Sequence, residues 1–129
     1  MPRFVLLRHE CPPSFGKPSH WDFMLEWGNR LRTWELRELP QGWARALGVD
    51  GDASTVAARA LPDHRAIYLD YEGPLTGDRG SVRRSDAGTY EILVESGSTL
   101  KIALEGRHWC GVLQLSGSES AWTITTINA

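Results

Sequence analysis

HWDFMLEWGNRLRTWELRE, residues 20–38, holds two runs of alternating side chains separated by a short turn signal. In the first run, aromatic and leucine side chains share one face: Trp21, Phe23, Leu25 and Trp27. The intervening residues point the other way: His20, Asp22, Met24 and Glu26. A period of two is typical of a half-buried strand, and Gly28-Asn29 favours a tight turn before the alternation resumes at Arg30. The stretch therefore predicts a β-hairpin.

Further strands are expected at 3–8, 66–71, 89–95, 99–105, 109–115 and 122–127, separated by turn-forming pieces such as Ser96-Gly97-Ser98. Many short strands with regular turns indicate an antiparallel barrel or sandwich. The exception is the region 40–60, where the alanine-rich pieces GWARAL and ASTVAARA predict short helical turns that end before Pro62. The expected fold class is therefore mainly β.

Composition limits the class of protein. A length of 129 residues predicts one domain, 1–129, with one site, and 41% hydrophobic with 23% charged residues is ordinary for a globular protein. The apolar stretches are too short for a signal peptide or a membrane span, so we expect a cytoplasmic protein with no membrane partner. Cys11 and Cys110 form no CxxC pair and are expected to be reduced thiols. A net charge of −2 means that any contact with nucleic acid must be local.

Histidine and aspartate side chains suggest a metal site. His20 and Asp22 are two residues apart on a strand, which puts them on one face about 7 Å apart. An imidazole with a carboxylate suits Mn²⁺, Zn²⁺ or Fe²⁺ better than Ca²⁺. His9 ends the first strand, and the loop 10–19 leads back to His20, so a third ligand can reach the same rim. The competing interpretation is a solvated polar face with structural histidines.

Other residues give weaker patterns. His64 precedes the expected strand 66–71 and shares parity with Tyr68 if the strand already begins there. His108 and Cys110 share a strand face, but no orienting third residue accompanies them as a nucleophilic pair needs. Neither of the glycine-rich nucleotide-binding motifs GxxxxGK[ST] and GxGxxG occurs. The stretch GDRGSVRR, 77–84, predicts a turn that presents arginines either to phosphate or only to solvent: Arg79, Arg83 and Arg84.

Taken in order, several of these residues compose a family pattern. The pattern consists of His9, then HWDFMLE (20–26), LRTW (31–34), Asp63-His64 with Tyr68, Tyr71-Glu72-Gly73 and Gly88-Thr89-Tyr90. Over roughly 4–115 the chain resembles the 3′-phosphoesterase domain of bacterial and archaeal DNA ligase D proteins, here as a stand-alone homologue. The resemblance implies a small closed antiparallel β-barrel with one or two short helical turns.

The resemblance also implies an activity. Members of this family remove a 3′-terminal ribonucleotide or a 3′-phosphate from DNA or RNA primer ends in DNA repair, which leaves a 3′-hydroxyl. They use a divalent metal, usually Mn²⁺, with Zn²⁺ or another transition metal as the alternative. By this resemblance, His9, His20 and Asp22 would be the metal ligands, and His64 and Tyr68 would act on the phosphate. Polymerase and ligase components would have to act in trans.

One position departs from the family. Met24 stands where members usually carry a phosphate-binding arginine. Loss of the arginine's charge-assisted contact is expected to weaken transition-state binding by roughly 2–4 kcal/mol. Arg79, Arg83 or Arg84 are candidate substitutes. Three hypotheses stay open: a metal-dependent phosphoesterase, a metal-containing module that binds nucleic-acid ends or a repair partner without turnover, and an unrelated barrel whose polar residues are structural.

Overall fold

The alternating stretch 20–38 forms the expected hairpin. The computed structural model describes residues 1–127, and Asn128 and Ala129, the end of the expected 1–129 domain, lie outside the described residues. Strands β2 (His20–Trp27) and β3 (Arg30–Leu36) pair antiparallel across Gly28-Asn29. Gly28 has a φ of 64°, a conformation that glycine adopts without a steric cost. The short turn fixes the register, so Asp22 lies opposite Glu35.

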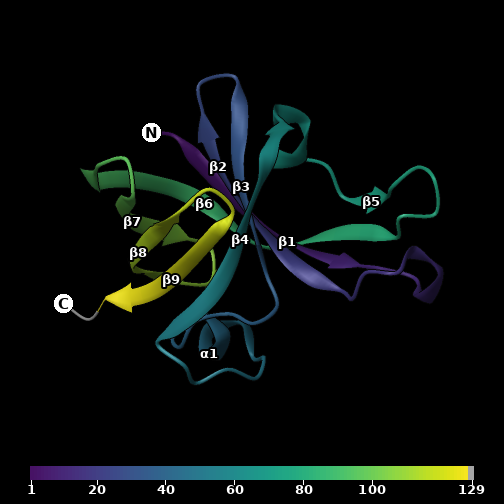
Figure 1. Cartoon of the computed structure of the whole chain (residues 1–129), viewed down its shortest axis with the longest axis horizontal. Coiled ribbons are helices and arrows are strands. Elements are labelled where there is room, and N and C mark those ends of the chain that lie inside the picture. The colour runs from purple at the N-terminus through teal and green to yellow at the C-terminus, as the bar shows by residue number, and fades with distance from the viewer. Residues whose placement is uncertain (128–129) are drawn as a thin grey trace.

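The other strands complete a closed barrel. They are β1 (Arg3–Glu10), β4 (Thr55–Arg65), β5 (Gly73–Pro74), β6 (Ser81–Glu95), β7 (Thr99–Gly106), β8 (Cys110–Ser118) and β9 (Ala121–Ile127). The hydrogen-bonded order is β1-β2-β3-β4-β9-β8-β7-β6, and β6 pairs back onto β1, which closes eight antiparallel strands into a ring (Figure 1). The short β5 lies beside the start of β6. The expectation of a small closed antiparallel barrel is confirmed.

Helical structure is short. The expected turn over GWARAL is confirmed as α1 (Trp43–Leu47), which ends at Gly48 in a left-handed conformation. Two 3-10 turns, η1 (Pro13–Phe15) and η2 (Ala66–Leu69), complete the set. None of the helical segments within residues 1–127 has the length and apolar character needed to cross a membrane.

Two predicted elements were wrong. ASTVAARA lies mostly in β4 and not in a helix, because pairing with β3 on one side and β9 on the other outweighs the helix propensity of alanine. Val56 and Ala58 are buried there, and Ala57 between them is exposed. The strand expected at 66–71 is instead η2, where Leu69 turns inward while Ile67 stays exposed.

Both faces of the sheet around β1, β2 and β3 bury apolar side chains. The barrel interior is filled by residues from all eight strands and α1, here called the inner core, including Phe4, Leu6, Phe23, Leu25, Trp34, Trp43, Tyr90, Ile102, Leu113 and Ile124. The opposite face carries a second group, the outer apolar cluster: Val5, Leu7, Met24, Leu31, Leu69 and Val82. The segment from η2 to β5 packs on this outer face through Tyr68, Tyr71 and Leu75. The face that was expected to be polar and solvated is therefore largely covered.

Candidate metal centre

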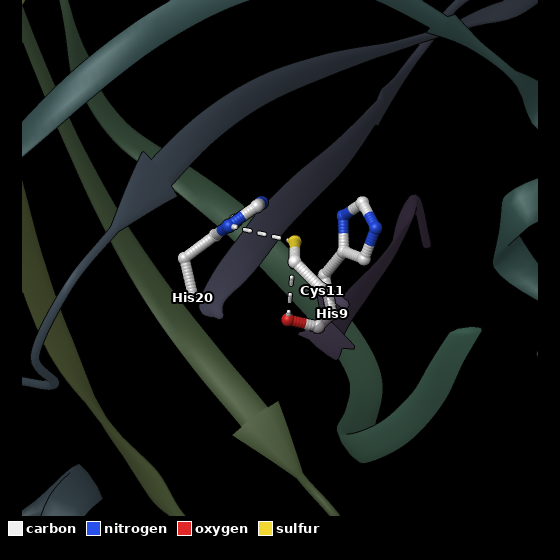
Figure 2. Close-up of side chains that lie close together, drawn as sticks. All are labelled: His9, Cys11 and His20. Carbon is white, nitrogen blue, oxygen red and sulfur yellow. Dashed lines mark hydrogen bonds between the residues drawn. The ribbon is translucent and has the colours of Figure 1, made fainter. Parts of the chain in front are cut away.

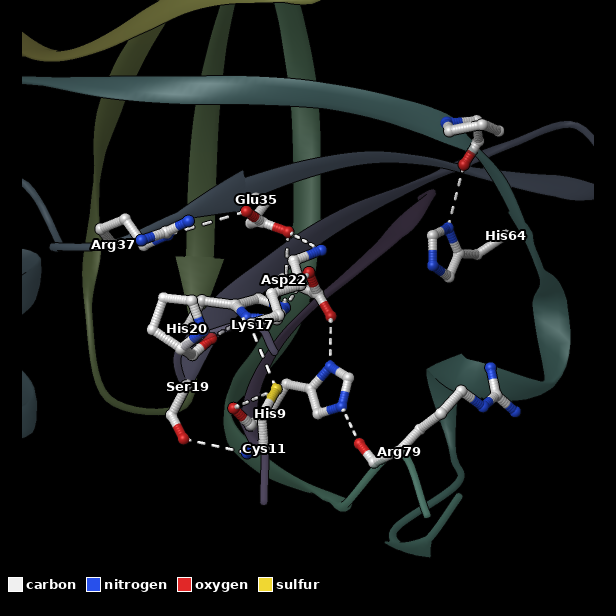
Figure 3. Close-up of polar contacts among 12 residues, drawn as sticks. His9, Cys11, Lys17, Ser19, His20, Asp22, Glu35, Arg37, His64 and Arg79 are labelled. Carbon is white, nitrogen blue, oxygen red and sulfur yellow. Dashed lines mark hydrogen bonds and ion pairs between the residues drawn. The ribbon is translucent and has the colours of Figure 1, made fainter. Parts of the chain in front are cut away.

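One end of the covered outer face is polar. Adjacent ends of β1, β2 and β3 bring together four buried residues, here called the polar cluster: His9, His20, Asp22 and Glu35. The register pairs His9 with His20 and Asp22 with Glu35, so all four side chains share one face (Figure 3). The structure thus brings together the three residues expected as metal ligands and adds Glu35.

Backbone carbonyls fix the orientation of both imidazoles. His20 Nδ1 lies 2.9 Å from the Pro18 carbonyl oxygen, to which an N–H donates. In the neutral imidazole this leaves the lone pair on Nε2, which lies 3.3 Å from Asp22 Oδ1 and 3.6 Å from Glu35 Oε1. His9 Nε2 lies 2.7 Å from the Arg79 carbonyl oxygen, and its Nδ1 lies 3.6 Å from Asp22 Oδ2. An imidazole held in this way by a second-shell acceptor is typical of metal-ligating histidine.

The carboxylates of the polar cluster are short of partners. Asp22 Oδ1 is buried and has no hydrogen-bond partner, and the equally buried Glu35 Oε1 has only an ion pair with the Lys17 ammonium. A buried carboxylate oxygen without a donor is costly, and a bound cation removes that cost. Imidazole nitrogens together with carboxylate oxygens are donors that Mn²⁺, Zn²⁺ and Fe²⁺ accept. The polar cluster therefore fits a divalent transition metal ion, which His9, His20, Asp22 and Glu35 could hold.

The electrostatics of the cluster favour an ionised aspartate. Burial by itself raises the pKa of Asp22, but the attraction of the adjacent His20 and His9 imidazoles outweighs burial and lowers the pKa to about 2. The Asp22 carboxylate in turn raises the pKa of His9, against the effect of burial, and the Arg79 carbonyl adds to the rise. Asp22 is consequently an anion at every physiological pH and is ready to ligate a cation.

Cys11 lies beside the two histidines but is poorly suited as a ligand. Its Sγ is 4.0 Å from His20 Nδ1 and 4.0 Å from the His9 carbonyl oxygen (Figure 2). His9, Cys11 and His20 are close enough to form a thiolate-containing metal site. However, His20 Nδ1 already donates to Pro18, and burial raises the pKa of the Cys11 thiol. The available lone pairs therefore favour the carboxylate side of His20.

His64 and Tyr68 lie together at the end of β4 and in η2. Their rings meet edge to face with centroids 5.9 Å apart, and His64 Nδ1 bonds the Pro62 carbonyl at 3.0 Å. Figure 3 shows His64 set apart from the polar cluster, and within residues 1–127 no hydrogen bond or ion pair joins the two. Tyr68 and Arg79 both line a pocket of about 130 Å³. The two expected phosphate-acting residues thus share one place, separate from the metal ligands.

The structure separates the three arginines of 77–84. Arg79 stays in the turn, where its guanidinium bonds Thr76 and its carbonyl accepts from His9. Arg83 and Arg84 belong to β6 and point to opposite faces, because the strand begins at Ser81. Arg84 is on the face of the polar cluster, but its guanidinium bonds the Asp70 carbonyl at 3.2 Å. A single turn that presents all three arginines is therefore not formed.

Met24 has a different environment from the one its strand pattern predicted. Its side chain is 1% exposed and belongs to the outer apolar cluster. A phosphate group could not reach this position without opening the packing around it. The position where the resemblance places an arginine is therefore part of a core in this chain.

Sequence reasoning missed Glu35 and Lys17. The signal for Glu35 was present, because a two-residue turn at Gly28-Asn29 sets Glu35 opposite Asp22 in the hairpin register. Lys17 lies in the loop between β1 and β2, and its ammonium contacts Glu35 Oε1 as an ion pair (Figure 3). No periodicity marks a loop residue, so nothing in the sequence indicated this contact.

Comparisons with known proteins leave the site to be interpreted from its own residues. No protein-family model matches the chain, and no curated protein sequence matches it. The resemblance to the ligase D phosphoesterase domain accordingly stands on the ordered motifs alone.

Proposed function

We propose that this protein is a metal-dependent phosphoesterase that processes 3′ ends of DNA or RNA in the cytoplasm, removing a terminal ribonucleotide or phosphate to leave a 3′-hydroxyl. The observation that carries the proposal is that the buried Asp22 carboxylate lies between two imidazoles, with Oδ2 3.6 Å from His9 Nδ1 and Oδ1, which lacks a hydrogen-bond partner, 3.3 Å from His20 Nε2. The same three residues match the metal ligands of the family that the sequence resembles.

Some residues of the site would bind the metal ion, and others orient those ligands. His9, His20 and Asp22 would hold the ion, most simply Mn²⁺ or Zn²⁺, with the two imidazoles aimed by the carbonyls of Arg79 and Pro18. When bound, a divalent ion supplies Lewis-acid stabilisation to a phosphate oxygen. The geometry favours nitrogen and oxygen donors over the Cys11 thiol.

His64 is the proposed proton donor. Its Nδ1 bonds the Pro62 carbonyl, which leaves Nε2 directed elsewhere and able, when protonated, to give a proton to a leaving oxygen. The Tyr68 ring packs edge to face against the His64 ring, with centroids 5.9 Å apart. Tyr68 and Arg79 line one pocket, in which we propose that a phosphate binds.

An end-processing assay tests the proposal. Purified protein with Mn²⁺ is incubated with primers that end in a 3′-phosphate or in one ribonucleotide, and we expect a 3′-hydroxyl product. His20→Ala should abolish the product, whereas replacement of the exposed His108, which lies outside the polar cluster, should not. Absence of product with Mn²⁺, Zn²⁺ and Mg²⁺ would contradict the proposal.

A second function is favoured by the burial of Met24 and by the separation of Arg83 from Arg84. With fewer free cations facing the site, the protein could bind nucleic-acid ends, or polymerase and ligase partners in trans, without turnover. This function predicts that metal-loaded protein retains end-labelled primers in a filter-binding assay and leaves them uncut. If His20→Ala changes neither metal content nor primer binding, it is contradicted.

A further inference from the structure

We propose that Lys17 is a displaceable counter-ion of the polar cluster: its ammonium balances Glu35 in the metal-free protein, and a divalent cation takes its place at Glu35 Oε1. Glu35 would then be a fourth ligand beside His9, His20 and Asp22. The inference rests on the metal centre of the proposed function and extends it to two residues outside the family pattern.

Glu35 has the position of a ligand. Glu35 is only 4% exposed, and its Oε1 lies 3.6 Å from His20 Nε2. His20, Asp22 and Glu35 each offer a donor atom, and these atoms lie within 4.8 Å of one another. Because β2 and β3 fix the register, Asp22 and Glu35 stay opposite each other whether or not a cation is present.

The contact with Lys17 is suited to exchange. Glu35 Oε1 contacts the Lys17 ammonium as an ion pair, and no other described residue donates a hydrogen bond to this oxygen. The Lys17 side chain is 32% exposed and comes from the loop after η1, not from a strand. A long, flexible side chain on a loop can move into water at little cost. A rigid arginine fork in a strand would be harder to displace.

The charges of the cluster favour a divalent ion over the ammonium. Asp22 and Glu35 bring two buried negative charges, and the buried oxygens face a single ammonium. Arg37 contacts the other oxygen, Glu35 Oε2, at 3.8 Å from an exposed position and can remain there when Lys17 leaves. A doubly charged ion at Oε1 neutralises both carboxylates at once, which Lys17 cannot do.

Titration of the full chain with Mn²⁺, followed by the electron paramagnetic resonance signal of free Mn²⁺, tests the proposal. Lys17→Met removes the competitor and should tighten Mn²⁺ binding about two- to fivefold. Glu35→Gln removes a ligand and should weaken binding on the order of tenfold or more. Lys101→Met, at the other lysine of the chain, should change nothing. Unchanged or weaker binding by Lys17→Met overturns the proposal, as does unchanged binding by Glu35→Gln.

Amine labelling gives a readout without substitutions. Lys17 and Lys101 are the two lysines of the chain, so Lys101 is an internal control. With Zn²⁺ added, acetylation of Lys17 measured by mass spectrometry should become several-fold faster, because the amine leaves its ion pair, while acetylation of Lys101 stays constant. An unchanged rate at Lys17 overturns the proposal.

The outcomes also separate this inference from the proposed function. If the wild type binds Mn²⁺ and the Lys17 and Glu35 variants behave as expected, but no 3′-hydroxyl product forms, only the phosphoesterase function fails. If product forms but the variants bind Mn²⁺ like the wild type, only the counter-ion role fails. A wild type that binds none of Mn²⁺, Zn²⁺ and Mg²⁺ overturns both.

Discussion

The two ends of the outer face of β1, β2 and β3 are equally buried, but their side chains differ in how well their surroundings match them. Met24 in the outer apolar cluster and His20 in the polar cluster are each 1% exposed. At the apolar end, burial is matched by packing, which stabilises by removing carbon from water. At the polar end, burial leaves Asp22 Oδ1 without a hydrogen-bond partner and Glu35 Oε1 with only an ion pair to the Lys17 ammonium. Of these two ends, the polar one has a need that a bound cation would meet.

The largest effect is expected from making the apolar end charged. Met24→Arg places a guanidinium among the fully buried side chains of Val5, Leu7 and Leu31. We expect a loss of about 3–5 kcal/mol in the free energy of unfolding, measured by urea denaturation. Met24→Leu, which keeps the volume, should cost less than about 1.5 kcal/mol. An arginine variant as stable as the leucine variant would contradict the account of this end.

An intermediate effect is expected from titrating the polar end. Folding lowers the pKa of Asp22 from 3.8 to about 2, so its stabilisation is fully present above pH 3.8 and is lost as the pH falls through about 2. The loss should be roughly 2 kcal/mol in metal-free protein, measured by denaturation at several pH values with a chelator present. Asp22→Asn should remove this part of the acid dependence. Identical acid profiles for the variant and the wild type would show that the histidines do not hold Asp22 as described.

The smallest effect on stability is expected at His64, which belongs to neither cluster. Its ring is partly exposed and bonds only the nearby Pro62 carbonyl among the described contacts. His64→Ala should change the free energy of unfolding by no more than about 0.5 kcal/mol. Product formation, if the phosphoesterase proposal holds, should fall by about 10²- to 10⁴-fold, measured in the primer assay. A large loss of stability would assign His64 a structural role instead.

Local patterns in the sequence were sufficient for the hairpin and for much of the polar cluster. The period of two across 20–38 placed His20 and Asp22 on one face, and the loop that follows His9 returns the chain so that His9 pairs with His20. These features depend on strand geometry and on a turn, both of which act over a few residues. The same hairpin register places Glu35 opposite Asp22, so Glu35 could have been predicted from the turn as well.

Features that depend on distant partners could not be predicted in the same way. ASTVAARA became β4 because β3 and β9 pair with it, and neither neighbour is visible in its own composition. Met24 is buried because η2 returns Leu69 over the outer face. No local sequence pattern indicates this return of the chain. Arg83 and Arg84 were assigned to a turn because the start of β6 was placed at Thr89 and not at Ser81. The contact of Lys17 with Glu35 likewise depends on the path of a loop.

If the polar cluster is a metal centre, anomalous diffraction from crystals grown with Mn²⁺ will locate the ion there. The account predicts one strong anomalous peak within bonding distance of His20 Nε2 and of the Asp22 and Glu35 carboxylates, with the Lys17 ammonium no longer at Glu35. A peak bound through Cys11, or no peak at the polar cluster at saturating Mn²⁺, would contradict it.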